Sequence, residues 1–283
     1  MSEIEIKNKK PPLFYKQFIL DEKTDWVVFL HGAGGSSAIW YKQIRDYRKN
    51  FNVLLIDLRG HGKSKNIIRK KVRKKYTFDD ISKDVIDVLD YLEIESAHFV
   101  GISLGTLLIR NIAENYPERV KSMIMGGAII RFNLKSNLLA FFGNSLKNVL
   151  PFIWLYKLLA WIIMPKKRHK QSRIVFINEA KNVAHKEFLR WMGLLSDVKP
   201  LMRFFREKDT EKPTLYLMGE EDYIFLPPVK NVVKKHKKSF LRVIHDSGHV
   251  CNIDQAQIFN KLSIDFIKKY NNYDGEKELL IAE

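Results

Sequence analysis

The sequence predicts an α/β fold, in which a mostly parallel β-sheet is flanked by helices and carries a helical insertion. Short, continuously apolar runs alternate with longer segments of helical periodicity, as the buried strands and covering helices of a parallel sheet do. Between about residues 131 and 206 this alternation stops, and aromatic-rich helical periods replace it. We therefore divide the chain into a first core part (1–130), a helical cap (131–206) and a second core part (207–283).

Six apolar runs are expected to form the strands, and each ends at a glycine or a polar residue that marks the following turn. A helix is expected over residues 104–115, because Pro117 disfavours its continuation, and a closing helix over 255–270. In the cap, helical periods cover residues 138–142, 149–164 and 188–195. The six expected strands are residues 26–30, 52–56, 97–100, 122–125, 214–218 and 240–244.

The composition and the net charge of the chain indicate which partners and which cellular compartment to expect. The net charge is +17, but the basic runs lie far apart and no nucleic-acid-binding motif accompanies them. We interpret most of this charge as lysine-rich, solvated surface and expect no nucleic-acid partner. The single cysteine, Cys251, excludes an intramolecular disulfide and fits a reducing compartment. The polar first residues lack the apolar centre of a signal peptide, so a cytoplasmic location is expected.

Polar and glycine-rich segments follow the expected strands. In open parallel sheets, functional groups gather at the carboxyl ends of the strands, so these segments are expected to meet at one edge. Together they contain a serine, several carboxylates and histidines. The segments are residues 31–35, 57–62, 101–105, 219–222 and 247–249.

Ser103 is the expected nucleophile. It stands in a G-x-S-x-G sequence between an expected strand and an expected helix, which is the setting that gives this short motif its meaning. Small residues two positions before and two after the serine permit a tight turn that holds the hydroxyl clear of the sheet. The plainer interpretation is a serine that caps the helix between two packing glycines.

A serine hydroxyl needs a base to take its proton, and a histidine after a late strand is the expected base. His249 fits, and Asp222 follows the preceding strand, where the residue that orients the histidine is expected. The chain order serine, aspartate, histidine is the order of one particular class of serine hydrolases. Three other carboxylates remain open as the acid: Asp246, Glu220 and Glu221.

An acyl-transfer intermediate carries an oxyanion, which needs hydrogen-bond donors placed in advance. The expected donors are the backbone N–H groups of Leu104 and of Ala33, in the glycine-rich turn at residues 31–35. His31 and Gly32, in the same turn, are candidate substrate contacts. A phosphate cradle is the alternative, but the glycine spacings of nucleotide-binding loops are absent. No metal or cofactor site is expected.

These segments together resemble the α/β-hydrolase superfamily over about residues 24–270. Residues 29–32 resemble its oxyanion-loop motif, residues 57–64 are similar to the D-x-R-G-x-G-x-S segment of its esterase, lipase and C–C hydrolase branch, and residues 101–105 resemble its nucleophile elbow. Residues 219–222 and 248–249 look like its acid and base loops. The resemblance implies an eight-stranded, mostly parallel sheet, a helical cap after the sixth strand, and catalysis without a cofactor.

The expected function is hydrolysis of carboxylic esters, as in carboxylesterases or monoglyceride lipases, through an acyl-enzyme on Ser103. Two alternatives remain: a C–C hydrolase or lyase that uses the same residues on an anionic substrate, and a non-catalytic ligand-binding protein. Aromatic cap residues suit a small apolar ester, and the candidate substrate contacts are Trp154, Trp161 and Trp191. Packing of the cap onto the core is the other interpretation of these tryptophans.

The mostly apolar character of residues 149–164 suggests that this stretch could contact a membrane. No uncharged apolar stretch is long enough to span a bilayer. Residues 149–164 are nevertheless followed by a basic run at 166–170, a combination that is compatible with peripheral contact at an anionic membrane.

Overall fold

A computed structural model describes residues 11–67, 75–131 and 151–271, and its centre is a seven-stranded sheet. The strand order is β1-β3-β2-β4-β5-β6-β7; β1 is antiparallel to β3, and all other neighbours are parallel. All six expected strands occur. The described residues add β1 but hold no eighth strand. The strands are β1 (Tyr15–Phe18), β2 (Trp26–Leu30), β3 (Asn52–Ile56), β4 (Ala97–Ile102), β5 (Val120–Gly126), β6 (Thr214–Gly219) and β7 (Ser239–Ile244).

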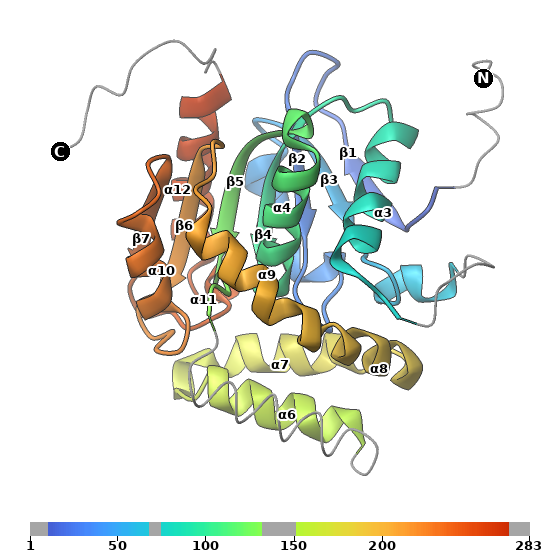
Figure 1. Ribbon diagram of the computed structural model, residues 1–283, viewed down its shortest axis with the longest axis vertical. Helices are drawn as coiled ribbons and strands as arrows, with labels where there is room; N and C mark the ends of the chain where they lie inside the picture. Colours follow the sequence, from blue (N-terminus) through green and yellow to red (C-terminus); the bar gives the residue numbers. More distant parts are fainter. Residues whose placement is uncertain (1–10, 68–74, 132–150, 272–283) are drawn as a thin grey trace.

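Helices cover both faces of the sheet, and a separate group lies across one of its ends (Figure 1). The helices of the core are α2 (Ile44–Tyr47), α3 (Phe78–Tyr91), α4 (Leu104–Asn115), α10 (Leu226–Val233), α11 (Cys251–Asp254) and α12 (Ala256–Asn271). Those of the cap are α6 (Phe152–Ile163), α7 (Lys170–Ala180), α8 (His185–Gly193) and α9 (Leu195–Glu207). Short 3-10 helices are η1 (Ser37–Trp40), η2 (Gly62–Asn66), η3 (Pro117–Arg119) and η4 (Lys167–His169).

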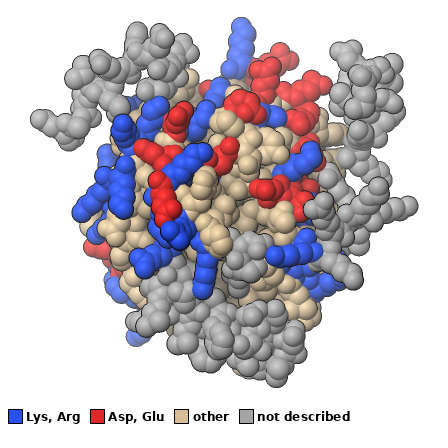
Figure 2. All heavy atoms as spheres, in the orientation of Figure 1, with Lys and Arg blue, Asp and Glu red and all other residues tan. Residues whose placement is uncertain are grey.

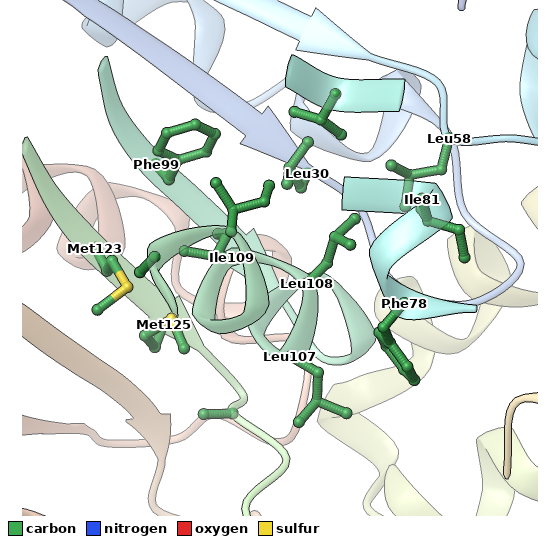
Figure 3. Packing of buried hydrophobic residues seen from close by; sticks show 14 of the residues in the cluster. Leu30, Leu58, Phe78, Ile81, Phe99, Leu107, Leu108, Ile109, Met123 and Met125 are labelled. Atoms are coloured by element: carbon green, nitrogen blue, oxygen red, sulfur yellow. The ribbon is translucent and has the colours of Figure 1, made fainter. Parts of the chain in front are cut away.

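The inner strands β2 to β6 are largely buried on both faces because each face is covered. In β2, Val28 and Leu30 belong to the cluster formed with α3, α4 and α10, whereas Val27 and Phe29 belong to the cluster formed with α2 and α12. This alternation follows from the two-residue period of a strand. Figure 3 shows the first cluster, with Leu107 and Leu108 of α4 among its residues. The core therefore holds the central strands rigidly from both sides.

The cap helices α6–α9 connect β5 to β6 and lie across one end of the sheet, with α6 outermost (Figure 1). They span residues 152–207, whereas the sequence assigns residues 131–206 to the cap. The second expected helical period corresponds to α6 and the third to α8; the first, residues 138–142, lies outside the described residues. Among the described residues, no helix has the length and apolar character needed to cross a membrane.

Candidate active site

Ser103 occupies a strained turn between β4 and α4. Its backbone has φ 55° and ψ −121°, in the left-handed half of φ space that a side chain disfavours. Two hydrogen bonds hold the turn: the Ser103 N–H donates to Gly126 O at 3.0 Å, and the Thr106 hydroxyl donates to Ser103 O at 2.6 Å. The hydroxyl of Ser103 is thereby presented at the end of the sheet, where it stays partly exposed.

The two glycines of the motif allow α4 to approach the sheet. A Cβ at Gly105 would lie 2.3 Å from Leu30 O, and one at Gly101 would lie 2.5 Å from a methyl group of Ile109. Neither contact is compatible with the observed packing. The G-x-S-x-G spacing therefore has a steric cause in this chain: the helix begins directly against the ends of β2 and β4.

His249 and Asp222 form a hydrogen-bonded chain with Ser103. The Nε2 of His249 lies 2.9 Å from Ser103 Oγ, and its Nδ1 lies 2.8 Å from Asp222 Oδ2. His249 and Asp222 are buried, at 2% and 1% exposed. The second oxygen of Asp222 accepts the N–H of Phe225 at 3.1 Å, and the Phe225 ring packs against the imidazole. A carboxylate at Nδ1 favours the tautomer that leaves Nε2 free to accept the serine proton.

The other three carboxylates have different partners. Glu221 contacts Lys166 Nζ at 2.6 Å and His169 Nε2 at 2.8 Å. Asp246 pairs with Arg168, and Glu220 lies 3.2 Å from the exposed His245. Of the four carboxylates weighed from the sequence, the structure brings Asp222 to His249.

The proposed oxyanion donors belong to two segments that meet at Ser103, the turn at residues 31–35 and the start of α4. Ala33 and Leu104 are both partly exposed, and none of the described residues accepts a hydrogen bond from either backbone N–H. Gly32 lies directly beside the serine, since a Cβ there would be 3.1 Å from Ser103 Cβ. Leu104 is also the first residue of α4, where the helix dipole favours negative charge.

His31 is a structural residue rather than a substrate contact, which corrects the expectation from the sequence. It is fully buried; its Nε2 accepts the N–H of Leu58 at 3.0 Å, and its Nδ1 donates to Gly32 O at 2.8 Å. Both ring nitrogens are therefore occupied, and the ring ties the oxyanion turn to the loop after β3.

His61, which we did not predict, supports the same turn. Its ring packs 5.1 Å from that of His31, and its Nε2 accepts the N–H of Gly34 at 3.0 Å. Burial, together with the neighbouring His31, lowers the pKa of His61 to about 3, and burial also lowers the pKa of His31. Both rings are thus neutral at pH 7. Within the described part of the chain, no group of three or more His, Cys, Asp or Glu residues could hold a metal ion.

The three tryptophans lie in different places. Trp154 and Trp161 are on the outer side of α6, 61% and 57% exposed, so the structure does not bring them to Ser103. The cause is the helical period, which turns Tyr156 and Ala160 inward instead. Trp191 is half-buried; its indole N–H donates to Arg59 O at 3.0 Å, and its ring packs against His61. Trp191 joins the cap to the core.

A basic segment of the cap, Lys166, Arg168 and His169, contacts the loops that carry Asp222 and His249. All three side chains lie within ion-pair distance of Glu221, and Arg168 also reaches Asp246. The buried His169 ring lies on Gly248, where a Cβ would come within 2.8 Å of it. We call this arrangement the cap clamp. In the sequence its only signal is a basic run, which does not reveal its acidic partners.

Comparison with known proteins identifies a family that the sequence of this chain matches. Residues 25–153 match the family model described as the alpha/beta hydrolase fold. Together with the sheet order and the elbow, this match shows that the chain has the α/β-hydrolase fold.

Similar proteins extend over most of the chain at low identity. A dihydrolipoyllysine-residue acetyltransferase component of an acetoin cleaving system from Pseudomonas putida is 26% identical over 86% of this chain; the match spans 64% of that protein's length. An uncharacterized carboxylesterase of Bacillus subtilis is 27% identical over 83% of this chain and 76% of its own. Among solved structures, the enol-lactonase from Burkholderia xenovorans LB400 has a TM-score of 0.73 at 20% identity, covering 90% of this chain and 96% of its own.

Proposed function

We propose that this protein hydrolyses carboxylic esters through a covalent acyl-enzyme on Ser103. The observation that carries the proposal is the unbroken hydrogen-bonded chain from Ser103 Oγ through His249 to the buried Asp222. Each link has the distance that proton transfer and tautomer control require. Similarity to a carboxylesterase and to an enol-lactonase supports the same bond class.

In the proposed reaction, His249 Nε2 takes the proton of Ser103 as Oγ attacks the ester carbonyl. The negative charge that develops on the carbonyl oxygen is stabilised by the N–H groups of Ala33 and Leu104. His249 then donates its proton to the departing alkoxide, which leaves as the alcohol. Water, deprotonated by the same imidazole, attacks the acyl-enzyme and releases the acid. Asp222 remains ionised throughout and stabilises the imidazolium.

An apolar substrate fits the residues between cap and sheet. We base this on the partly buried hydrophobic side chains that the elbow, the segment after β5 and the cap pack against the core, which would offer an acyl group contact area rather than charge. These side chains are Leu104, Ile129, Leu159, Ile162 and Trp191.

The test is a comparison of Ser103→Ala with Ser96→Ala on a series of p-nitrophenyl acyl esters. Ser96 is a half-buried serine immediately before β4, at the end of that strand opposite Ser103, and serves as the matched control. We expect Ser103→Ala to lose about three or more orders of magnitude in kcat/KM, while Ser96→Ala keeps its activity. Full activity of a folded Ser103→Ala variant contradicts the proposal.

A fluorophosphonate probe separates the two alternative functions. Labelling of Ser103 without turnover of any ester favours a C–C hydrolase or lyase that uses the same residues. Absence of labelling in the folded protein favours a non-catalytic binding protein. Labelling that Ser103→Ala abolishes, together with ester turnover, supports the proposed function.

A further inference from the structure

The outer side of α6 is an exposed apolar face. Trp154, Leu158 and Trp161 are 61%, 50% and 57% exposed, and their spacing of four and three residues places them on one side of the helix. We call these three residues the α6 face. The opposite side of the helix carries the buried Tyr156, Ala160 and Ile163, which pack within the molecule. Folding therefore buries one side of α6 and leaves two tryptophans in water.

The α6 face lies within an exclusively cationic part of the sequence. Residues 131–178 contain nine Lys or Arg residues and no Asp or Glu. Lys157, Lys167 and Lys170 are exposed, and none has a carboxylate partner among the described residues. Elsewhere the charges are mixed: Figure 2 shows acidic and basic side chains interspersed over the face of the core that it presents. The cap therefore combines exposed aromatic surface with uncompensated positive charge.

We propose that the α6 face docks on the surface of an anionic lipid bilayer. Tryptophan suits this location because its ring is apolar while its N–H stays in contact with water and headgroups. Each lysine near such a surface adds attraction to the negative lipids. The helix would lie in the plane of the interface and would not span it, in agreement with its twelve residues. A nucleic acid fits less well, since the face itself is apolar.

The geometry connects this surface to the candidate active site. On the inner side of α6, the Tyr156 ring contacts the oxyanion turn so closely that a Cβ at Gly34 would lie 2.6 Å from it. One helix thus has the proposed lipid contact on one side and the turn that carries Ala33 on the other. The docking proposal does not depend on ester hydrolysis, because it concerns binding alone.

The test is co-sedimentation of the full chain with sucrose-loaded vesicles of phosphatidylcholine, with and without phosphatidylglycerol, at low salt. We expect binding to the anionic vesicles, weakened by added salt, and little binding to pure phosphatidylcholine. Trp154→Ala combined with Trp161→Ala is expected to lower the partition coefficient by about tenfold or more. Lys167→Glu and Lys170→Glu are each expected to lower it by about fivefold or more.

Two controls make the result decisive. Leu158→Ala is compared with Ile258→Ala, because Ile258 is also a helical aliphatic residue, 44% exposed, but lies on α12 of the core; the first substitution should weaken binding and the second should not. Circular dichroism melting shows that each variant is folded. Equal binding of the double tryptophan variant and the wild type overturns the proposal. So does self-association in light scattering that the double variant abolishes without any vesicle binding, because the face is then an interface between two copies.

Discussion

At Asp222 the two carboxylate oxygens accept different hydrogen bonds, and this division fixes the histidine. Oδ1 accepts a backbone N–H from Phe225, and Oδ2 faces His249 Nδ1 at 2.8 Å. The neighbouring Glu221 has the same charge but points into the cap clamp. The two adjacent carboxylates therefore have separate partners: Asp222 binds the imidazole of His249, and Glu221 binds the basic residues of the cap.

The pair Asp222→Asn and Glu221→Gln tests this separation with two substitutions of the same chemistry. An amide at residue 222 permits the wrong imidazole tautomer, so we expect ester turnover to fall by about 10⁴-fold. Glu221→Gln leaves the hydrogen bonds of His249 intact and is expected to stay within about tenfold of the wild type. Steady-state kinetics on a p-nitrophenyl ester provide the measurement. A larger loss for Glu221→Gln than for Asp222→Asn contradicts the assignment of the acid.

At the scale of elements, the cap is held from two sides. On one side the cap clamp contacts the loops after β6 and β7, and Ser172 of α7 bonds Asp254 of α11. On the other side, Glu187 of α8 accepts the Tyr76 hydroxyl at 2.5 Å. Burial raises the pKa of Glu221, but hydrogen bonds from Lys166 and His169 outweigh it, so the pKa lies below its ordinary value. Glu221 is accordingly ionised at neutral pH, and the clamp is charged.

Removing the charge of Glu221 is expected to loosen the cap without unfolding the sheet. In Glu221→Gln, amide exchange over residues 166–180 should become about tenfold faster, because hydrogen bonds to a charged group are replaced by weaker ones. Exchange in β4 and β5 should stay unchanged, since these strands lie in the core. Hydrogen exchange followed by mass spectrometry measures both regions in one experiment. Uniform acceleration across the sheet would show that Glu221 stabilises the whole fold instead.

For the whole molecule, the sheet brings together residues that are remote in sequence. Ser103 and His249 are 146 positions apart, yet they follow β4 and β7, two strands of the same sheet. The sheet also places His31 directly after β2 and His61 in the loop after β3, where both side chains are buried next to the oxyanion turn. Because both imidazoles are held neutral there, the stability of the molecule depends on pH.

This pH dependence has a definite sign. The pKa of His61 is about 3 in the folded protein and about 6.5 when unfolded, so between these values the unfolded state binds more protons. The contribution of His61 to the free energy of unfolding is full above about pH 6.5. It decreases as the pH falls, by at most about 1.4 kcal/mol per pH unit. We expect the stability difference between wild type and His61→Gln, from urea unfolding, to be larger at pH 7.5 than at pH 4.5. His245→Gln, at an exposed side chain, is the control and should show no such trend; an equal difference for His61→Gln at both pH values contradicts the argument.

Local sequence patterns are sufficient to predict the strands and helices whose apolar residues follow a clear period. The inner strands β2, β3 and β6 are apolar runs, and the sequence predicts α4 over the residues that it occupies because a motif precedes it and a proline follows it. The strand β1 was missed because it is a short edge strand, Tyr-Lys-Gln-Phe, with its middle residues exposed. Helix α7 was missed because it packs between α6 and the core, so its sequence has no single apolar side.

The sequence by itself determined the α/β class, the G-x-S-x-G turn with Ser103, and the candidates for its acid and base, because these depend on local pattern and chain order. Only the tertiary structure decided which carboxylate faces His249, that His31 is a buried support, and that Trp154 and Trp161 point outward. The physical reason is that these outcomes depend on contacts between segments 27 to 146 positions apart and on the rotation of a helix about its own axis. Neither is encoded in the spacing of neighbouring residues.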